Sequence, residues 1–536
     1  MSDYEVKHIE HLGLVSGFCR EVGLVEFIDS QFPEQSEHKN LSYGQCLQAM
    51  ILNGLGYTSQ TLYLQSQFFE GKASELLLGK GIAPEHINDD ILGRCLDKLY
   101  EFGVSKLYMG LAEQVVDKLG LEIKSHHLDS TSFHTDGNYE QETDDENRIN
   151  IVQGYSRDHR PELNQVILNL ITENQAGIPL YMKAASGNSS DKMDFHQIVK
   201  AHITSLKSAH TNPYFIMDSA GFTEDNLIYF DKNNRYMVSR VPGNLVDAKQ
   251  LIQVTPMSDF IDLDNGYKGI WQGSDYAGIS QRWLLLFSEQ AFERESKTLD
   301  RQMLKQAELC RKSLKKLKAQ VFACEADALK AIDKWNQSQK YHQISRPSVN
   351  VKGRYKSKGK PKKDQVYDYH EYFIEGELYT LIERRHEALN HKGKFIIATN
   401  DVDSAMSMQE LLDLYKSQQK VERGFRFLKS PEFLTSSFYL KKPERIEALL
   451  MVMTCCLMVY AGLEHQIRTK LKEKKLYFPN QKKKPVQNPT TRWVFFSFMD
   501  ISLLTINADQ KIVVNIKERH EVILQALGVN YKYFYS

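Results

Sequence analysis

The sequence predicts a mixed α/β protein with a helical unit before its sheet and an insertion within it. Residues 1–120 show apolar positions spaced by three and four, as amphipathic helices do. Short apolar runs of strand length alternate with helical segments over residues 121–240, which favours a mixed sheet. This order breaks off over residues 241–393 and resumes over 394–465, ahead of a C-terminal region, 466–536. At 536 residues the chain is too long for one ordinary domain.

The composition is that of a globular protein, with 42% hydrophobic and 25% charged residues. The 68 basic and 68 acidic side chains give a formal net charge of zero, so no whole-protein field attracts nucleic acid or a membrane. Contacts with such partners must come from local patches. Seven cysteines without a CxxC pair argue against a disulfide framework or a zinc site, and they favour a reducing, cytoplasmic compartment.

No membrane partner is expected from the apolar segments. The N-terminal "MSDYEVKHIEHLGLV" lacks the basic region and apolar run of a secretory signal. The most apolar run, Ala448–Leu463, stops at Glu464, short of the roughly 20 residues that a membrane span needs. We interpret this run as a buried helix, with a membrane segment as the poorer alternative.

The first two regions supply the elements of the helical unit and of the sheet. Helices are predicted for "SYGQCLQAMILNGLG" and "DDILGRCLDKLYEFGVSKLYMGLAEQVVDKLG", with Asp89 and Asp90 as helix caps. The runs "KSHHLDSTSFHTDG", "NQVILNLITE" and "IPLYMKAAS" predict three strands, and a helix, the strand "PYFIMDSAG", a second helix and the strand "RYMVSRV" follow. Several of these strands are nearly all apolar, as central strands are.

The interrupting region has strands at both ends and helices between them. The runs "YKGIWQ" and "QRWLLLFSEQ" predict strands, and residues 290–337 predict a long helical hairpin or coiled packing. A Lys/Gly-rich loop, "VKGRYKSKGKPKKD", precedes the strand-like "YDYHEYFIEGELYTLIE". A final strand, "KFIIATND", leads into a charged helix, and the region after residue 466 has no assigned role.

Two aspartates stand at the ends of apolar strands, each followed by a small hydroxyl residue. They are Asp129 in "HHLDSTSFH" and Asp218 in "YFIMDSAGF". A carboxylate at a strand exit lies at the rim of a sheet, where α/β folds bind ligands, although such an Asp taken singly is more often a turn residue. His126 and His127 point to opposite faces of their strand and are more often packed than metal ligands.

The charged helix predicted over Leu414–Phe433 carries a polar stripe. At about 100° per residue, Tyr415, Gln418, Glu422 and Lys429 fall within a wedge of roughly 60°. Apolar residues on the adjoining face indicate that this helix packs on a core. A lone helical Glu is usually solvated, but with two strand-end acids in the same chain Glu422 is predicted to be a third acidic ligand.

Three carboxylates on rigid elements suit Mg²⁺ or Mn²⁺, because hard cations prefer oxygen ligands. Two such ions about 4 Å apart activate the attacking oxygen and stabilise the leaving oxygen in phosphoryl transfer. The helical stripe would then face a metal-bound phosphodiester. Lys429 and Tyr415 would contact its phosphates, with Arg426 beside them.

These residues resemble the Y-x2-R-x3-E-x6-K motif of the DDE transposases of the IS4-like superfamily, particularly its IS1634-type group. Gln418 stands in place of the motif's Arg. The resemblance extends over residues 80–240 and 394–465, through "INDDILGRCLDKLYEFG", "HLDSTSFHTDG", "GYSRDHRPELNQVILNL", "GIPLYMKAASGNSSD" and "MDSAGF" in that order.

The resemblance implies an RNase H-like catalytic core, interrupted by an α+β insertion domain, in the transposase of a bacterial insertion sequence. Such enzymes bind terminal inverted repeats, cleave DNA at the ends of the element and join the freed 3′-OH to target DNA. The resemblance implies that Asp129, Asp218 and Glu422 are catalytic ligands of two Mg²⁺ or Mn²⁺ ions. It also implies double-stranded DNA as partner, a homodimer in the DNA complex, and a cytoplasmic protein that associates with the nucleoid when bound to DNA.

Further DNA contacts are open to two interpretations each. "GYSRDHRPE" places Arg157 and Arg160 between two strands, in a loop that is either solvated or in contact with the DNA backbone. The lysine runs Lys352–Lys363 and Lys482–Lys484 are either solvated or sites of salt-dependent phosphate contact. The helical residues 1–120 are the better candidate for reading inverted repeats, although they show no clear helix-turn-helix motif.

Two other functions remain open at this point. One is a catalytically inactive DNA-binding repressor or architectural protein, against which the intact acids and Lys429 stand. The other is an RNase H-like nuclease without strand transfer. Joining of a supplied 3′-OH end to a plasmid would separate the nuclease from a transposase.

Overall fold

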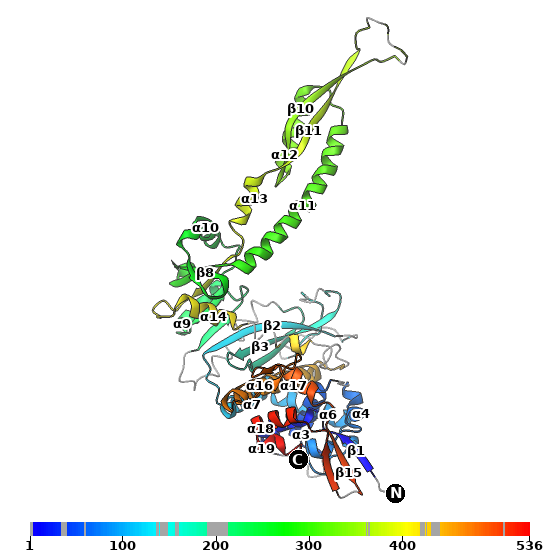
Figure 1. Cartoon of the computed structure of the whole chain (residues 1–536), viewed down its shortest axis with the longest axis vertical. Helices are drawn as coiled ribbons and strands as arrows, with labels where there is room; N and C mark the ends of the chain where they lie inside the picture. The colour runs from blue at the N-terminus through cyan, green and yellow to red at the C-terminus, as the bar shows by residue number, and fades with distance from the viewer. Residues whose placement is uncertain are drawn as a thin grey trace.

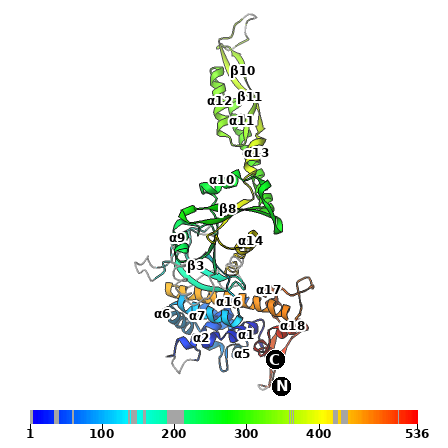
Figure 2. The ribbon, with the colours of Figure 1, turned by 90° about the vertical axis from the view of Figure 1, so that its left-hand side faces the viewer.

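The structure is a computed structural model with three parts along its long axis. A helical base holds both chain ends, a sheet crosses the middle, and a slender arm forms the far end (Figures 1 and 2). The structure describes residues 4–33, 40–57, 61–135, 139, 148–155, 160–189, 213–357, 359–360, 362, 365–418, 424, 426–429, 440–507 and 510–536.

The base joins helices from the two ends of the chain around one apolar core. Asn88 caps the N-terminus of α6, since its side chain accepts a hydrogen bond from Ile91 N at 3.1 Å. The prediction that Asp89 and Asp90 cap this helix is therefore wrong by one residue, since both lie in the first turn. The helices are α1 (Leu12–Val22), α2 (Leu24–Gln31), α3 (Tyr43–Leu55), α4 (Gln65–Phe69), α5 (Ser74–Leu78), α6 (Asp89–Phe102), α7 (Val104–Leu119), α16 (Pro443–Glu473), α17 (Thr491–Ser497), α18 (Glu518–Leu527) and α19 (Val529–Lys532).

α16 is the central helix of the base, and the prediction of a buried helix is confirmed. It is the one helix in the described part of the chain that is long and apolar enough to cross a membrane. In its most apolar window, 89% is buried inside the structure, as in the core helix of a globular protein. Arg445, near its N-terminus, donates two hydrogen bonds of 2.7 Å to the Asp97 carboxylate and so ties α16 to α6.

A small antiparallel sheet lies at the end of the base, where the two chain termini meet. β1 (Tyr4–His8) pairs with β15 (Ser502–Ile506), which pairs with β16 (Gln510–Val514). The helical prediction for the first region does not hold for Tyr4–His8. Its partner strand lies almost 500 positions away, so no local pattern announces the pairing.

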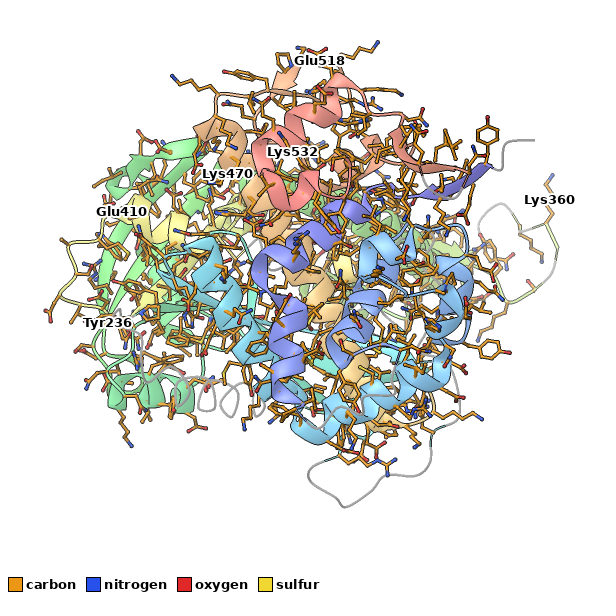
Figure 3. The ribbon with its side chains drawn as sticks, turned by 90° about the horizontal axis from the view of Figure 1, so that it is seen from below. Tyr236, Lys360, Glu410, Lys470, Glu518 and Lys532 are labelled. Carbon is orange, nitrogen blue, oxygen red and sulfur yellow. The ribbon has the colours of Figure 1, made fainter. Side chains whose placement is uncertain are left out.

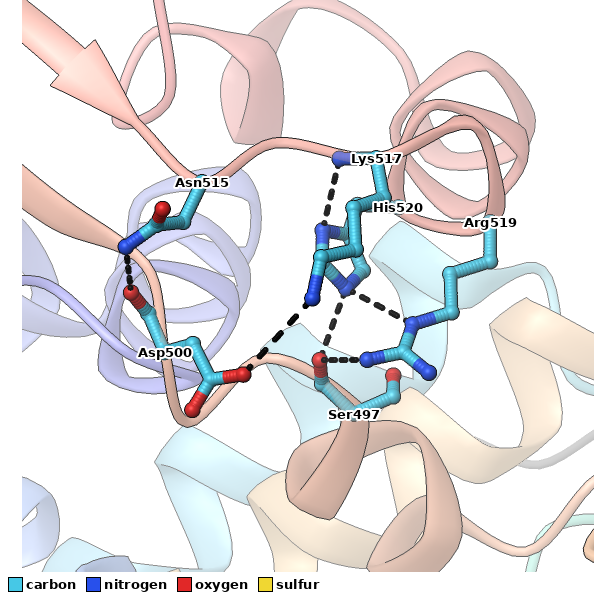
Figure 4. Close-up of polar contacts among 6 residues, drawn as sticks. All are labelled: Ser497, Asp500, Asn515, Lys517, Arg519 and His520. Atoms are coloured by element: carbon cyan, nitrogen blue, oxygen red, sulfur yellow. Dashed lines mark hydrogen bonds and ion pairs between the residues drawn. The ribbon is translucent and has the colours of Figure 1, made fainter.

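The C-terminal elements are joined by a buried histidine (Figure 4). Nδ1 of His520 accepts a hydrogen bond from Lys517 N at 3.1 Å, and Nε2 lies 2.7 Å from the carbonyl oxygen of Ser497 and 3.1 Å from Nε of Arg519. Burial lowers the pKa of His520. The ring therefore serves as a structural link between α17 and α18. A short hairpin, β13 (Phe478–Pro479) and β14 (Pro485–Val486), carries Lys482–Lys484 on its turn.

A nine-stranded mixed sheet forms the middle of the molecule, in the order β4-β3-β2-β5-β6-β12-β9-β8-β7. β2, β3 and β4 form an antiparallel meander, and β5 and β6 run parallel to β2. This is the strand order of the RNase H-like fold, so the predicted fold class is confirmed. The strands are β2 (Ser125–Thr135), β3 (Asn164–Glu173), β4 (Pro179–Ser186), β5 (Tyr214–Met217), β6 (Met237–Arg240), β7 (Ile261–Leu263), β8 (Tyr267–Ser274), β9 (Gln281–Ser288) and β12 (Lys394–Thr399).

The strands predicted within the interrupting region continue this same sheet. β12 pairs antiparallel with both β6 and β9, and β8 and β7 follow beyond β9. α9 (Glu224–Lys232) connects β5 to β6, and α10 (Val246–Val254) follows β6. The sheet thus carries the core strands at one end and the insertion strands at the other.

The arm is a helical hairpin packed against a long β-ribbon (Figure 1). A small apolar core of its own includes Leu314, Phe322, Ile332, Ile344 and Ile374. The predicted helical hairpin and the strand after the lysine-rich loop are confirmed, but the first residues of that loop, "VKGR", belong to a strand. The elements are α11 (Glu289–Ala319), α12 (Glu325–Ser338), β10 (His342–Arg354), β11 (Tyr369–Thr380) and α13 (Ile382–Leu389).

Candidate active site

Asp129 lies within β2 and Asp218 directly follows β5, the parallel strand beside it, so the prediction of a strand-end aspartate holds for Asp218 and is wrong for Asp129. The pairing of β2 with β5 puts His127 opposite Ile216, and the same register carried on by two residues sets Asp129 opposite Asp218, one residue beyond the end of β5. Neighbouring strands are about 4.8 Å apart, and residues at the same level of a parallel pair point to the same face. The two carboxylates therefore share one face and one level of the sheet.

The residues around them show which face this is. Ile216 packs with Leu411 and Leu412, whereas Phe215 and Met217 belong to the core on the opposite face. Leu411 and Leu412 lie on α14 (Met408–Lys416), so α14 covers the carboxylate face at the start of the strands. Further along β2, Phe133 packs into the core of the base. Since Phe133 lies four residues after Asp129, it is on the same face.

Backbone N–H groups hold the orientation of both carboxylates. Ser130 N donates to Asp129 Oδ1 at 2.8 Å. Ala220 N and Gly221 N donate to Asp218 Oδ1 at 2.9 and 3.2 Å. Within the described part of the chain, every hydrogen bond to the Asp218 carboxylate falls on Oδ1. The turn therefore fixes this side chain through Oδ1.

α14 starts with a strong cap and ends against β2. Ser407 forms a capping box with Glu410 at its N-terminus. At the other end Ser417 Oγ donates to Leu414 O at 2.6 Å and lies 3.0 Å from His127 Nε2. Ser417 and Gln418 form a turn, so the prediction of one continuous helix over Leu414–Phe433 is wrong at these two residues.

The chain after this turn packs on the base. Gly424 lies so close to α16 that a Cβ there would stand 3.1 Å from a methyl group of Leu457. Leu428 is buried in the same core, as predicted. Lys429 Nζ lies 5.9 Å from the centre of the Phe133 ring. Lys429 is therefore on the carboxylate face, on the opposite side of Asp129 from His127.

The other predicted contact residues differ in exposure. Tyr415 is half-buried against the core beneath α14, and Gln418 is buried, with 9% of its surface exposed. Arg426 is exposed, and exposed Arg160 is paired with Glu162. Gln418 therefore lacks the exposure that a free phosphate contact requires. Two predicted residues, Glu422 and Arg157, lie outside the described residues.

The chemistry of the two aspartates fits a divalent cation. Two carboxylates at one level of adjacent strands offer hard oxygen ligands on rigid elements, as Mg²⁺ and Mn²⁺ require. No group of three potential metal ligands occurs among the described residues, which do not include Glu422. The carboxylate pair is thus the described part of the candidate site.

His127 also belongs to this site, although its sequence context predicted only a packing role. It is fully buried, and Nε2 lies 3.1 Å from Ser125 Oγ as well as 3.0 Å from Ser417 Oγ. Its position two residues before Asp129 placed it on the carboxylate face from the outset. What the sequence does not contain is its partner, which lies 290 positions away.

An RNase H-like sheet with paired carboxylates on its two central parallel strands defines a class of enzymes that cut and join phosphodiester bonds of nucleic acids. The family model of the transposase DDE domain matches residues 127–459, more than half of the sequence, and the chain belongs to this family. It is a DDE-type DNA transposase. Enzymes of this type generally use divalent metal ions.

Two further comparisons concern the rest of the chain and its shape. A domain of unknown function (DUF4277) matches residues 4–113, which make up most of the helices at the N-terminal side of the base. No curated protein matches the sequence. Among solved structures, the chain is similar to a piggyBac transposase in a synaptic complex with hairpin DNA, at 7% identity and a TM-score of 0.39, over 93% of this chain and 83% of that one.

Proposed function

We propose that this transposase mobilises an insertion sequence of the IS1634-type group by cut-and-paste transposition. It binds the terminal inverted repeats of the element, cleaves at its ends and joins the freed 3′-OH to target DNA. The observation that carries this proposal is the level pairing of Asp129 and Asp218 on one face of the sheet. A repressor or an architectural protein has no need of such a carboxylate pair.

Glu422 is the proposed third metal ligand. The described residues on both sides of it are anchored on the carboxylate face, with Ser417 at His127 and Lys429 at Phe133. These anchors flank Asp129 along β2, two residues before it and four after it. Glu422 lies between the anchors in sequence, and a carboxylate there would complete the set of three acids.

Asp129, Asp218 and Glu422 would hold two Mg²⁺ or Mn²⁺ ions, and the ions supply activation of the attacking oxygen and stabilisation of the leaving one. The chain's own contribution is to orient the carboxylates through backbone N–H groups and to hold the phosphate near them. Lys429 and Tyr415 are the proposed phosphate contacts at the site.

Other DNA contacts are proposed around the site. Arg426, Arg157 and Arg160 would add contacts to the DNA backbone, and Gln418 would contribute indirectly because it is buried. Residues 1–120 would read the inverted repeat. We further propose that two copies assemble on paired DNA ends and that the protein works in the bacterial cytoplasm.

The test is strand transfer into supercoiled plasmid, with the element's own pre-cleaved ends and Mg²⁺ or Mn²⁺. Glu422→Gln removes the charge at nearly constant shape, and Glu308→Gln, which removes an exposed charge on α11, is the control. We expect joining by the wild type and the control and none by Glu422→Gln. Equal joining by Glu422→Gln would refute its role as a ligand.

The same assay separates the alternative functions. A wild type that nicks DNA without joining ends would be a nuclease. A wild type that binds the ends but neither cuts nor joins them would be an inactive DNA-binding protein.

A further inference from the structure

The arm leaves the sheet at the carboxyl ends of the strands, and Asp218 lies at the same ends. β9 runs parallel to β5, because each is connected through antiparallel pairing with β12 and parallel pairing with β6. Asp218 follows the last residue of β5, and α11 follows the last residue of β9. Asp218 and the start of α11 therefore lie at the same ends of their parallel strands.

The length of the arm is set by its long helix and ribbon. α11 has 31 residues, which at 1.5 Å per residue span about 46 Å. β10 adds a ribbon of 13 residues that ends in the lysine-rich turn at the far end of the molecule (Figure 1). The helix alone spans about 13 base pairs of B-form DNA at 3.4 Å each, and the ribbon places the turn further out.

The turn at the end of the arm is held in shape by aromatic rings. Tyr355 and Tyr367 lie with their ring centres 5.0 Å apart, and the Tyr355 hydroxyl donates to Gln365 O at 3.1 Å. The Tyr367 ring covers Gly353 so closely that a Cβ there would stand 2.3 Å from it. Asp368 accepts a hydrogen bond from Lys356 N at 2.9 Å. The turn is thus a built feature of the ribbon.

Positive charge gathers at this turn on a chain that is neutral as a whole. Between Lys352 and Glu371 the sequence has seven Lys or Arg against three Asp or Glu. Arg354 is neutralised by Glu371, 2.7 Å away. Lys356, Lys360 and Lys362 are exposed, and none of them has an ion pair within the described part of the chain. Lys360 projects at the outer edge of the molecule when it is viewed along the long axis (Figure 3).

We propose that Lys356, Lys360 and Lys362 form a distal clamp that binds the phosphate backbone of double-stranded DNA more than one helical turn from the cleaved phosphate. This inference rests on the proposed function, because it requires a DNA end held at the carboxylates. It assigns to the arm a contact that depends on the length of the duplex and is independent of its sequence. Uncompensated lysines on a neutral protein suit this partner, since each releases counterions from the phosphates.

A protein partner fits the turn less well. Among the described residues between β10 and β11, two exposed apolar side chains, Val366 and Tyr367, stand against three exposed cations, Lys356, Lys360 and Lys362. A protein surface on this turn would have to be acidic, whereas duplex DNA offers one negative charge per about 1.7 Å. The phosphate backbone is therefore the better match.

The experiment compares the affinity of the protein for duplexes that contain one element end. The duplex extends about 5 or about 30 base pairs beyond the cleaved phosphate. Each length is tested once on the element side and once on the flanking side. Fluorescence anisotropy over a range of salt is measured for the wild type, for Lys356→Gln/Lys360→Gln/Lys362→Gln and for the charge-preserving Lys→Arg triple variant. Thermal melting checks that all three proteins fold alike. Light scattering without DNA reports on self-association.

We expect the Gln variant to lose about ten-fold in affinity for a long extension only, and its salt slope to fall by about one unit per lysine. The Arg variant should match the wild type. If affinity depends on the length of the element side, the clamp holds the element's own DNA. If affinity depends on the length of the flanking side, the clamp holds the flanking DNA. Equal binding by the Gln variant and the wild type would overturn the clamp alone.

Failure of the wild type to bind any end duplex would overturn the proposed function and the clamp together. The Lys→Gln substitutions could instead change the mass of the DNA-free protein in light scattering and leave DNA binding unchanged. That result would identify the turn as a protein interface and overturn the clamp.

Discussion

Nε2 of His127 lies 3.0 Å from Oγ of Ser417 and joins the strand of the first catalytic candidate to the turn after α14. Both groups are at least partly buried, so this contact holds the start of the segment that carries Glu422 and Lys429 against β2. The link gives a position to a chain segment without touching the reacting atoms.

Removal of this link should slow catalysis without loss of DNA binding. For Ser417→Ala we expect strand transfer to fall about ten-fold and the Mn²⁺ concentration for half-maximal rate to rise, since partners that orient ligands commonly contribute 10–100-fold. Ser125→Ala is the matched control, because it removes the other hydroxyl near His127 Nε2 but leaves the bridge to Ser417. An unchanged metal dependence in Ser417→Ala would contradict a positioning role.

The carboxylate pair predicts a metal site that is measurable without DNA. Asp129→Asn and Asp218→Asn should each weaken Mn²⁺ binding at least about ten-fold and reduce strand transfer at least about 100-fold, because a carboxylate ligand is lost. Isothermal titration measures the first effect and gel analysis of joined products the second. Asp225→Asn, an exposed acid in the first turn of α9, is the control and should behave as the wild type. Normal metal binding by both site variants would rule out this pair as the ion's ligands.

Glu447 on α16 should make the protein less stable at neutral and alkaline pH than at acidic pH. Burial raises the pKa of Glu447 to about 7, with Lys183 opposing and Glu444 adding to the shift. Below about pH 4.5 both folded and unfolded chains carry the proton, so stability is full there. Between pH 4.5 and about 7 only the folded chain keeps the proton, so stability falls by about 1–3 kcal/mol as pH rises.

Glu447→Gln removes this effect and should raise Tm by several degrees at pH 8 and hardly at all at pH 4.5. Circular dichroism melts at the two pH values provide the measurement. Glu444→Gln, which breaks the 3.1 Å ion pair with Arg148, should lower Tm at pH 8. A gain of equal size at both pH values would show that the effect of Glu447→Gln is not one of protonation.

Close packing between α1 and α16 predicts a destabilising glycine substitution. A Cβ on Gly462 would stand 2.4 Å from the Phe18 ring, so Gly462→Ala should cost about 1–3 kcal/mol through overpacking. In an open helix the same change would stabilise by about 1 kcal/mol, so the sign of the change in Tm is decisive. Gly273→Ala, with no atom within 4 Å of the added Cβ, is the control and should leave Tm nearly unchanged. A higher Tm for Gly462→Ala would mean that Phe18 gives way.

The spacing of apolar residues along the sequence predicted the helices and strands whose formation depends on nearby residues. The apolar run at Ala448–Leu463 became the core helix, and the three/four spacing over residues 290–337 became the hairpin of the arm. Asp129 and Asp218 were found because each follows an apolar run, but only Asp218 ends its strand as predicted, since β2 continues past Asp129 to Thr135. Their roles as ligands stay predictions.

Contacts between distant residues determined what the sequence did not show. The strand Tyr4–His8 forms only because β15 lies beside it. The helix after Leu414 stops at Lys416, where Ser417 turns its hydroxyl to a backbone carbonyl and to His127. The hydroxyl of Tyr214 donates a hydrogen bond to the carboxylate of Asp401, 187 positions away. The sequence around either residue does not indicate this contact.

The arm begins and ends at one point of the sheet. Phe287 on β9 pairs with Lys394 on β12, and Ser288 N donates to Gly393 O at 2.9 Å. In topological terms everything from Glu289 to Gly393 is the loop of a single β-hairpin. Closure of a longer loop costs little more entropy than closure of a short one, so an element of this size can be lengthened, shortened or exchanged between transposases while the strands that carry the aspartates keep their register.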